Sequence, residues 1–168
     1  MKKIFRLISY LYSRITSQNN RFNFDHSFKT EIEANELLSH FIFFSSLIRK
    51  DSDKPKPAAF TINTARRDMS SYRIKELNEN QIWDIEKRYV SINRSDKKIS
   101  KARADFNIEI IKNYKSLKLN PDGNPMIRHC NIENFPSDKV EQKAIQVELA
   151  NQSTLIINPN QSPLKIIK

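Results

Sequence analysis

The sequence predicts an α+β domain with a mostly antiparallel or mixed sheet, helices on one face and an N-terminal amphipathic helix. Short runs rich in β-branched and aromatic residues recur along the chain, separated by turn-forming segments. Longer segments between them carry helix-start signals. The predicted strands lie near 38–45, 58–63, 71–75, 101–106, 126–132 and 154–158, and the predicted helices near 79–88, 107–114 and 137–151.

The first predicted strand belongs to the apolar run 38–48, which is too short to span a bilayer. His40 interrupts this run. We interpret it as a core histidine with satisfied hydrogen bonds, or as a site residue if it points to the same edge as His129. The runs 58–63 and 71–75 are joined by a basic loop, which indicates a β-hairpin.

The helix at 79–88 has a specific start signal, because Asn78 and Gln81 have the spacing of a capping box. Trp83 lies between apolar residues of this helix, which favours packing on the sheet over the alternative of stacking on a nucleic-acid base.

The two later helices are predicted to begin at polar caps, Asn107 for 107–114 and Ser137 for 137–151. The last helix has an apolar stripe that we expect to face the core, formed by Val140, Ala144, Val147 and Leu149. Between these helices, a brief strand at 116–119 leads into the sequence NPDGNP, a turn in which Gly123 is expected to take a positive φ.

Three parts of the chain are distinguished: a helical extension at 1–37, the α+β domain at 38–158, and a loose tail at 159–168. Residues 1–16 place apolar and basic side chains on opposite sides of a helix. Such a helix could dock on the domain, on a partner protein or on an anionic membrane surface. Arg6 interrupts its apolar part and no small-residue cleavage site follows, so we do not expect an export signal.

Composition excludes several kinds of site. Gly123 is the only glycine, so the glycine-rich loops that bind ATP or dinucleotides cannot form, and we expect no cofactor. Cys130 is the only cysteine, which excludes an internal disulfide and a multi-cysteine zinc site and fits a cytoplasmic location. The carboxylates Asp105, Glu109 and Glu133 lie on different predicted elements, so no metal site is expected.

Charge favours an anionic partner. The chain has 29 Lys and Arg against 19 Asp and Glu, a net charge of +10 with a sequence pI near 9.7, which makes nucleic acid a serious candidate. We therefore expect a cytoplasmic binding module that grips the RNA or DNA backbone. The predicted basic surface comprises Arg66, Arg67, Arg94, Lys97, Lys98, Lys101 and Arg103.

A second hypothesis is a metal-independent enzyme that processes RNA or a nucleotide. His129 would transfer a proton, and Arg103 or Arg128 would bind phosphate. Neighbours on a strand point to opposite faces, so Arg103 is the better partner for His129. The structural alternative is an ion pair between Asp105 and Arg128 on neighbouring strands, with His129 buried and satisfied. A third hypothesis is a protein-interaction subunit that docks through residues 1–16.

Five short motifs occur in a characteristic order: KPAAF at 56–60, YRIKELNENQIW at 72–83, ARADF at 102–106, RHCNI at 128–132 and, after a PSDK helix start, VELA at 147–150. In this order they resemble a family of small uncharacterised bacterial proteins. The resemblance covers residues 38–157, implies one domain preceded by an extension, and brings no catalytic residue.

One departure from that family concerns the cysteine. After the Arg-His pair the family has a small residue and a Gly-Trp-Pro turn, whereas this chain has Cys130 and Asn134-Phe135-Pro136. The departure argues against an essential thiol at Cys130.

Overall fold

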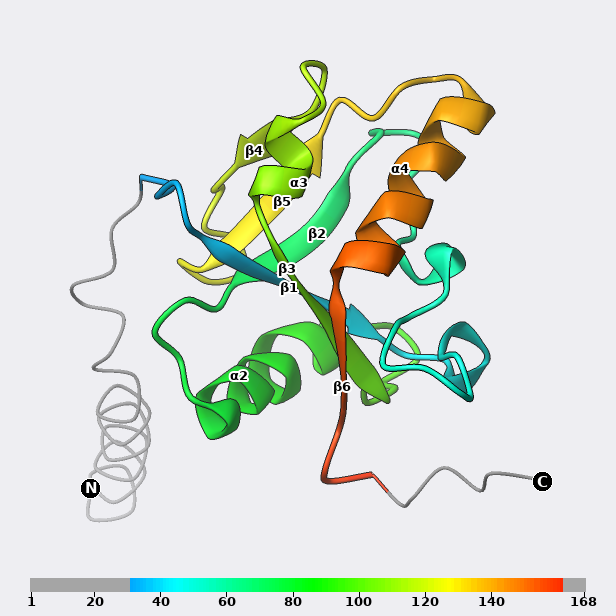
Figure 1. The fold of residues 1–168 in the computed structure, drawn as a ribbon. Coiled ribbons are helices and arrows are strands. Elements are labelled where there is room, and N and C mark those ends of the chain that lie inside the picture. Colours follow the sequence, from blue (N-terminus) through cyan, green and yellow to red (C-terminus); the bar gives the residue numbers. More distant parts are fainter. Residues whose placement is uncertain (1–30, 162–168) are drawn as a thin grey trace, which may run out of the picture. The chain divides into compact units, whose positions relative to one another are not determined.

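A computed structural model describes residues 31–161, which form one antiparallel sheet with helices on both faces (Figure 1). The predicted helix at 1–16 and the chain beyond residue 161 lie outside the described residues. The strands are β1 (Leu37–Ile42), β2 (Met69–Arg73), β3 (Ala102–Asn107), β4 (Lys118–Asn120), β5 (His129–Glu133) and β6 (Thr154–Ile157). The helices are α2 (Glu79–Ile85), α3 (Glu109–Lys112) and α4 (Lys139–Gln152), with a π-helical turn η4 (Glu86–Ser91) and 3-10 turns η2 (Ser45–Leu47) and η3 (Pro57–Ala59).

The strand order is β4-β5-β2-β1-β3-β6, and every pair is antiparallel. This confirms the α+β class and the antiparallel sheet. The centre of the sheet is therefore built from strands that are remote in sequence, since β1 lies between β2 and β3. Opposite positions form a row across four strands, in which His129 faces Tyr72, Tyr72 faces Ser39, and Ser39 faces Asp105.

The two faces of the sheet are covered by different helices, so the prediction of helices on one face is wrong. Ala104 and Phe106 of β3 belong to the core under α4, together with Leu149. Their neighbour Arg103 points the other way and contacts Glu79 and Trp83 of α2. The alternation of side chains along β3 thus assigns α4 and α2 to opposite faces.

Helix α2 begins as its sequence predicts. The Asn78 side chain accepts from the Gln81 N–H at 3.1 Å and the Gln81 side chain accepts from the Asn78 N–H at 2.9 Å, which completes the capping box. Trp83 is buried and packs beside Phe41, as expected for a core residue. The predicted helix end near residue 88 falls inside η4, where the chain changes from α- to π-helical geometry.

Helix α4 buries only one member of the predicted stripe, Leu149. Ile145, Leu149 and Ala150 face the core, whereas Val140 and Val147 are exposed. Ile145 and Leu149 are four residues apart and so lie on one side of the helix, and burying a leucine side chain stabilises the fold by about 1.5–3 kcal/mol. The cap is Asp138, whose side chain accepts from the Glu141 N–H at 2.8 Å, and not Ser137.

The segment 58–63 is not a strand. It contains η3 and the buried Phe60, and its link to β2 is a single bridge between Asn63 and Asp68, so the predicted hairpin is absent from the described residues. Pro57 begins η3, where its fixed φ favours a helical turn. The other predicted strands are confirmed, with ends that differ by one to three residues. Gly123 has a φ of 64°, as the turn requires.

Candidate functional site

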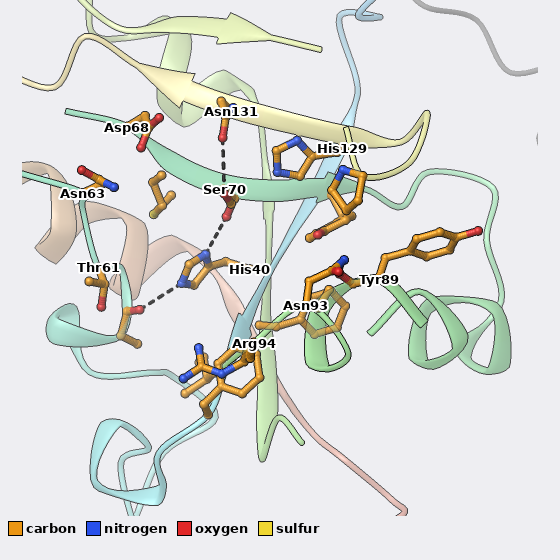
Figure 2. A pocket seen from close by; sticks show the side chains of 18 of the residues that line it. His40, Thr61, Asn63, Asp68, Ser70, Tyr89, Asn93, Arg94, His129 and Asn131 are labelled. Atoms are coloured by element: carbon orange, nitrogen blue, oxygen red, sulfur yellow. Dashed lines mark hydrogen bonds between the residues drawn. The ribbon is translucent and has the colours of Figure 1, made fainter. Parts of the chain in front are cut away.

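The described structure contains a cleft of about 830 Å³ at the place where β1 and β2 stop pairing (Figure 2). The two strands pair only at Leu38 with Arg73 and at Ser39 with Tyr72. Beyond Ser39, β1 continues beside β3, while β2 continues beside β5. Residues of both separated strands line the cleft.

His40 occupies the point of separation. Its Nδ1 lies 2.8 Å from the Ser70 carbonyl oxygen of β2, and its Nε2 lies 3.1 Å from the Ala59 carbonyl oxygen (Figure 2). The imidazole thus lies within hydrogen-bonding distance of a backbone carbonyl oxygen of β2 beside the cleft. Burial lowers the pKa of the imidazole, and the neutral ring donates to one of these oxygens at a time. His40 lines the same cleft as His129, and each of its ring nitrogens lies against a backbone carbonyl oxygen.

The cleft wall combines amide and hydroxyl groups with aromatic rings. The polar side chains are those of Thr61, Asn63, Ser70, Asn93, Asn124 and Asn131, and the aromatic ones are Phe41, Phe43, Phe44, Tyr72 and Tyr89. Ser70 Oγ donates to Asn131 Oδ1 at 3.3 Å. A wall of this kind can hydrogen-bond and stack on a flat polar ligand.

An aspartate and a histidine are joined at one end of the cleft. The Nδ1 of His129 lies 2.5 Å from Asp122 Oδ1, and Asn131 donates to the other carboxylate oxygen at 3.0 Å. The His129 ring meets Tyr72 edge-on, with centroids 5.1 Å apart. Burial, together with the Asp122 charge, raises the pKa of Tyr72, so this phenol stays neutral.

Two arginines line the cleft, and both were predicted as site residues. Arg66 is paired with Asp68 at 3.0 Å. Arg94 binds Asp96 through two N–H groups at 2.9 Å, and its guanidinium carbon lies 3.9 Å from the centroid of the Phe43 ring. The hydrogen bonds from Arg94 lower the pKa of Asp96, so the pair remains ionised at neutral pH.

A second hollow of about 560 Å³ adjoins the cleft and shares Phe43 and Phe44 with it. Its lining also includes Lys97, Lys98 and Lys101, and no acidic residue is among the described residues that line it. The ammonium groups of Lys97 and Lys101 donate to neutral oxygens, those of Ile92 and Gln161, both at 2.5 Å. We call this second hollow the lysine hollow.

Phe44 stands at the junction of the two hollows. Phe44 is 46 % exposed, which is unusual for a large apolar residue. The ammonium group of Lys98 lies 4.6 Å from the centroid of its ring. Lys98 also lies 3.6 Å from Asp96. Three of the predicted basic residues, Lys97, Lys98 and Lys101, therefore line one hollow with an exposed aromatic ring, and Arg94 lies over Phe43 in the adjoining cleft.

Arg103 is not part of this surface. Its side chain is 1 % exposed and lies under α2, where it binds both oxygens of Glu79, at 2.5 and 2.8 Å, and the Asp105 carboxylate at 3.1 Å. Its guanidinium carbon is 4.9 Å from the centroid of the Trp83 ring. Burial opposes the charged form, but Glu79 and Asp105 outweigh it and raise the pKa of Arg103. The side chain anchors α2 to the sheet.

Arg128 and Asp105 do not meet either. Arg128 is buried and donates to the Arg73 and Lys75 carbonyl oxygens at 3.5 and 3.3 Å. The predicted pair with Asp105 is absent because β5 and β3 are not neighbours in the sheet. For the same reason Arg103 is not beside His129: three strand spacings, about 14 Å in all, separate the rows of β5 and β3.

Arg67 is exposed and has a φ of 54°, but it lines neither hollow. Cys130 follows His129 on β5 and is fully buried, since adjacent residues of a strand point to opposite faces. Burial raises the pKa of its thiol to about 12. Such a thiol is protonated at neutral pH and is a poor nucleophile.

The positive charge is unevenly distributed along the chain. Residues 31–161 contain 21 Lys and Arg against 18 Asp and Glu, a net charge of +3. Residues 1–30 contain six basic residues and one acidic residue. The net charge of the described part is therefore small, and its anion-binding capacity depends on where its lysines gather.

Sequence reasoning missed Asp122 and Phe44. Asp122 lies in the NPDGNP turn, where aspartate is common for reasons of turn geometry, so its position next to a histidine could not be recognised. Phe44 belongs to an apolar run and was assigned to a buried strand, but β1 ends at Ile42. The signal available was the polar pair Ser45-Ser46 directly after it, which indicates a strand end.

Across residues 31–161 no three His, Cys, Asp or Glu side chains are grouped so that they could bind a metal ion. Within the same range, no helix has the length and apolar character needed to cross a bilayer.

Comparisons with known proteins give no family assignment. No family model matches this chain, and neither a curated protein nor a solved structure matches it. The resemblance to a family of small uncharacterised bacterial proteins stays a prediction, and the geometry of the site is the basis for the function proposed below.

Proposed function

We propose that this protein binds single-stranded nucleic acid along the cleft and the lysine hollow. The observation that carries the proposal is the grouping of Lys97, Lys98 and Lys101 around the exposed ring of Phe44, without a carboxylate in the lining of that hollow.

The chemistry of the groove matches this class of ligand. Proteins that bind single strands combine cations for the phosphates with aromatic rings on which bases stack. The ammonium groups of Lys97 and Lys101 donate to neutral oxygens and not to carboxylates, and Phe44 supplies an exposed ring. The adjoining cleft supplies amides, such as Asn93 and Asn131, that can hydrogen-bond to base edges.

The shape favours a single strand over a duplex. The lysine hollow and the cleft share Phe43 and Phe44, so a chain bound in one can continue into the other. The described part has no long basic helix: α4 carries Lys139 and Lys143 but also Glu141 and Glu148. Readout of a duplex in the major groove by an inserted helix therefore has no support here.

The experiment measures binding of a fluorescent 2′-O-methyl RNA of about 12 nucleotides, within the site size of small single-strand binders, by anisotropy. The variant Lys97→Ala/Lys98→Ala/Lys101→Ala removes the three ammonium groups. Because each lost phosphate contact changes the dependence of log K on log salt by about 0.7 for single strands, we expect the slope to become shallower by about 2.

A matched control removes three exposed lysines elsewhere, as Lys115→Ala/Lys118→Ala/Lys143→Ala. It has the same net charge as the first variant and should retain most of the affinity. Equal losses in the two triple variants, or binding that does not change between about 50 and 200 mM salt, would rule out a specific groove. Phe44→Ala should weaken binding by about 1–3 kcal/mol through loss of stacking.

A further inference from the structure

The two histidines that line the cleft differ in one respect. Both ring nitrogens of His40 lie against backbone carbonyl oxygens. His129 is bonded at Nδ1 to Asp122, and no group among residues 31–161 is hydrogen-bonded to its Nε2. The backbone of this range thus contacts both ring nitrogens of His40, whereas it contacts neither ring nitrogen of His129. His129 is 5 % exposed and lines the cleft, and one of its ring nitrogens has no partner among the described residues.

The partner of His129 fixes which nitrogen is unused. An ionised carboxylate only accepts hydrogen bonds, so Nδ1 carries the proton and the lone pair of the neutral ring is on Nε2. The arrangement is held from several sides. Asn131 donates to the second oxygen of Asp122 at 3.0 Å, and Tyr72 packs against the edge of the imidazole. An imidazole positioned in this way can accept a proton from a bound ligand at Nε2 when the ring is neutral.

We propose that Asp122 and His129 make the cleft a metal-independent ribonuclease site, an inference that rests on the proposed binding of single-stranded nucleic acid. His129 Nε2 takes the proton of a ribose 2′-hydroxyl. The 2′ oxygen forms a bond to the adjacent phosphorus, the bond from phosphorus to the 5′ oxygen breaks, and the 5′ oxygen takes a proton from water. The products are a 2′,3′-cyclic phosphate and a 5′-hydroxyl end, and His129 returns its proton to solvent.

The negative charge that grows on the phosphate in this step calls for a cation, and the cleft is lined by two arginines. Arg66 and Arg94 line the same cleft, and their bonds to Asp68 and Asp96 leave other guanidinium N–H groups available. His129 touches the reacting hydroxyl and is the catalytic residue in this scheme. Asp122 acts through His129 and is a positioning residue.

The test uses the full chain, a chelator, and two fluorescent oligonucleotides of one mixed sequence, one of unmodified RNA and one fully 2′-O-methylated. The first should be cut to fragments whose mass shows a cyclic phosphate. The second, which lacks the attacking hydroxyl, should be bound and left intact. His129→Gln and Asp122→Asn should each reduce kcat by about 10²–10⁴-fold. Both variants keep Lys97, Lys98 and Lys101 and should still bind the methylated strand, so the loss should appear mainly in kcat.

The outcomes separate the two proposals. If the wild-type protein binds the methylated strand but leaves the unmodified RNA intact, the ribonuclease proposal is wrong and the binding proposal stands. If neither strand is bound, the binding proposal fails first. Cleavage by His129→Gln at the wild-type rate would assign the activity to a contaminant. A fall in kcat for Asp122→Asn with KM unchanged is expected of a positioning residue, whereas a loss of folding would lower both binding and cleavage.

Discussion

The Arg103 cluster and the His129 cluster lie on the same face of the sheet, and each joins a basic side chain to a carboxylate. They differ in what covers them. Arg103 binds Glu79 and Asp105 beneath α2. His129 binds Asp122 at the edge of the cleft. The row of opposite residues from His129 through Tyr72 and Ser39 to Asp105 connects the two clusters across the sheet.

The difference arises from the spacing of the strands and the path of the helix. Near Arg103, β1 and β3 remain paired along their whole length, and α2 crosses above them with Trp83 against the guanidinium. On the side of His129, the pairing of β1 with β2 ends at Ser39 and Tyr72, and the cleft lies where the two strands separate beyond that pair. A buried ion pair whose hydrogen bonds are satisfied has a structural role, whereas a polar group with unused capacity in a cleft is available to a ligand.

The largest effect is expected when the covered cluster loses its cation. Arg103→Leu leaves Asp105 buried without a partner, and we expect the free energy of unfolding to fall by about 3–5 kcal/mol in urea denaturation. Burial already raises the pKa of Asp105, so its unpaired carboxylate is costly. The double variant Arg103→Leu/Asp105→Leu removes both charges and should recover most of the loss. A single variant as stable as wild type would show that the cluster is dispensable.

A smaller effect is expected at the open cluster. Asp122→Asn keeps a hydrogen-bonding side chain of the same size, and Asp122 is partly exposed, so we expect the free energy of unfolding to fall by about 1 kcal/mol or less. The same urea titration measures it. A loss as large as that of Arg103→Leu would mean that His129 and Asp122 form a structural pair, and the comparison between the clusters would fail.

The smallest effect concerns pH and the exposed partner of Arg103. The hydrogen bond from Arg103 lowers the pKa of Glu79 below its usual value near 4.5. A carboxylate whose folded pKa is lowered stabilises the fold above its unfolded pKa, and this contribution is lost as the pH falls through the folded pKa. Because the Glu79 side chain is 61 % exposed, we expect Glu79→Gln to reduce stability at pH 7 by up to about 1 kcal/mol.

The pH series tests this assignment. The stability difference between wild type and Glu79→Gln should be constant from about pH 6 to 7 and shrink below pH 4.5, since the wild type then loses the charge that the variant lacks. A difference that stays constant down to pH 2, or that grows as the solution is acidified, would contradict a lowered pKa at Glu79.

Local signals in the sequence predicted several elements correctly. The capping box of Asn78 and Gln81 and the positive φ of Gly123 depend only on residues close together in the chain. The buried side of a helix was harder to predict where apolar residues occur on more than one side. Of the predicted stripe in α4 only Leu149 is buried, beside Ile145, whereas Val140 and Val147 are exposed, because the sheet determines which side of the helix is buried.

The candidate site shows the same division. Four of its basic residues, at 94, 97, 98 and 101, are neighbours in sequence, so their grouping could be predicted. The assignment of Arg103 to the same surface was wrong, because a strand sends alternate side chains to opposite faces and a helix from elsewhere in the chain covers one of them. No local sequence pattern predicted the contact between Asp122 and His129.

What the sequence determined by itself is the class of fold, the type of most elements, the exclusion of glycine-rich nucleotide loops and the clustering of lysines after residue 93. The tertiary structure alone decided which charged groups are covered and which are open. Strand order placed two strands between β5 and β3, separated His129 from Arg103, and left a cleft where β1 parts from β2. The spacing of residues predicts which side chains lie on the same side of a helix or strand. Only long-range pairing determines what packs against that side.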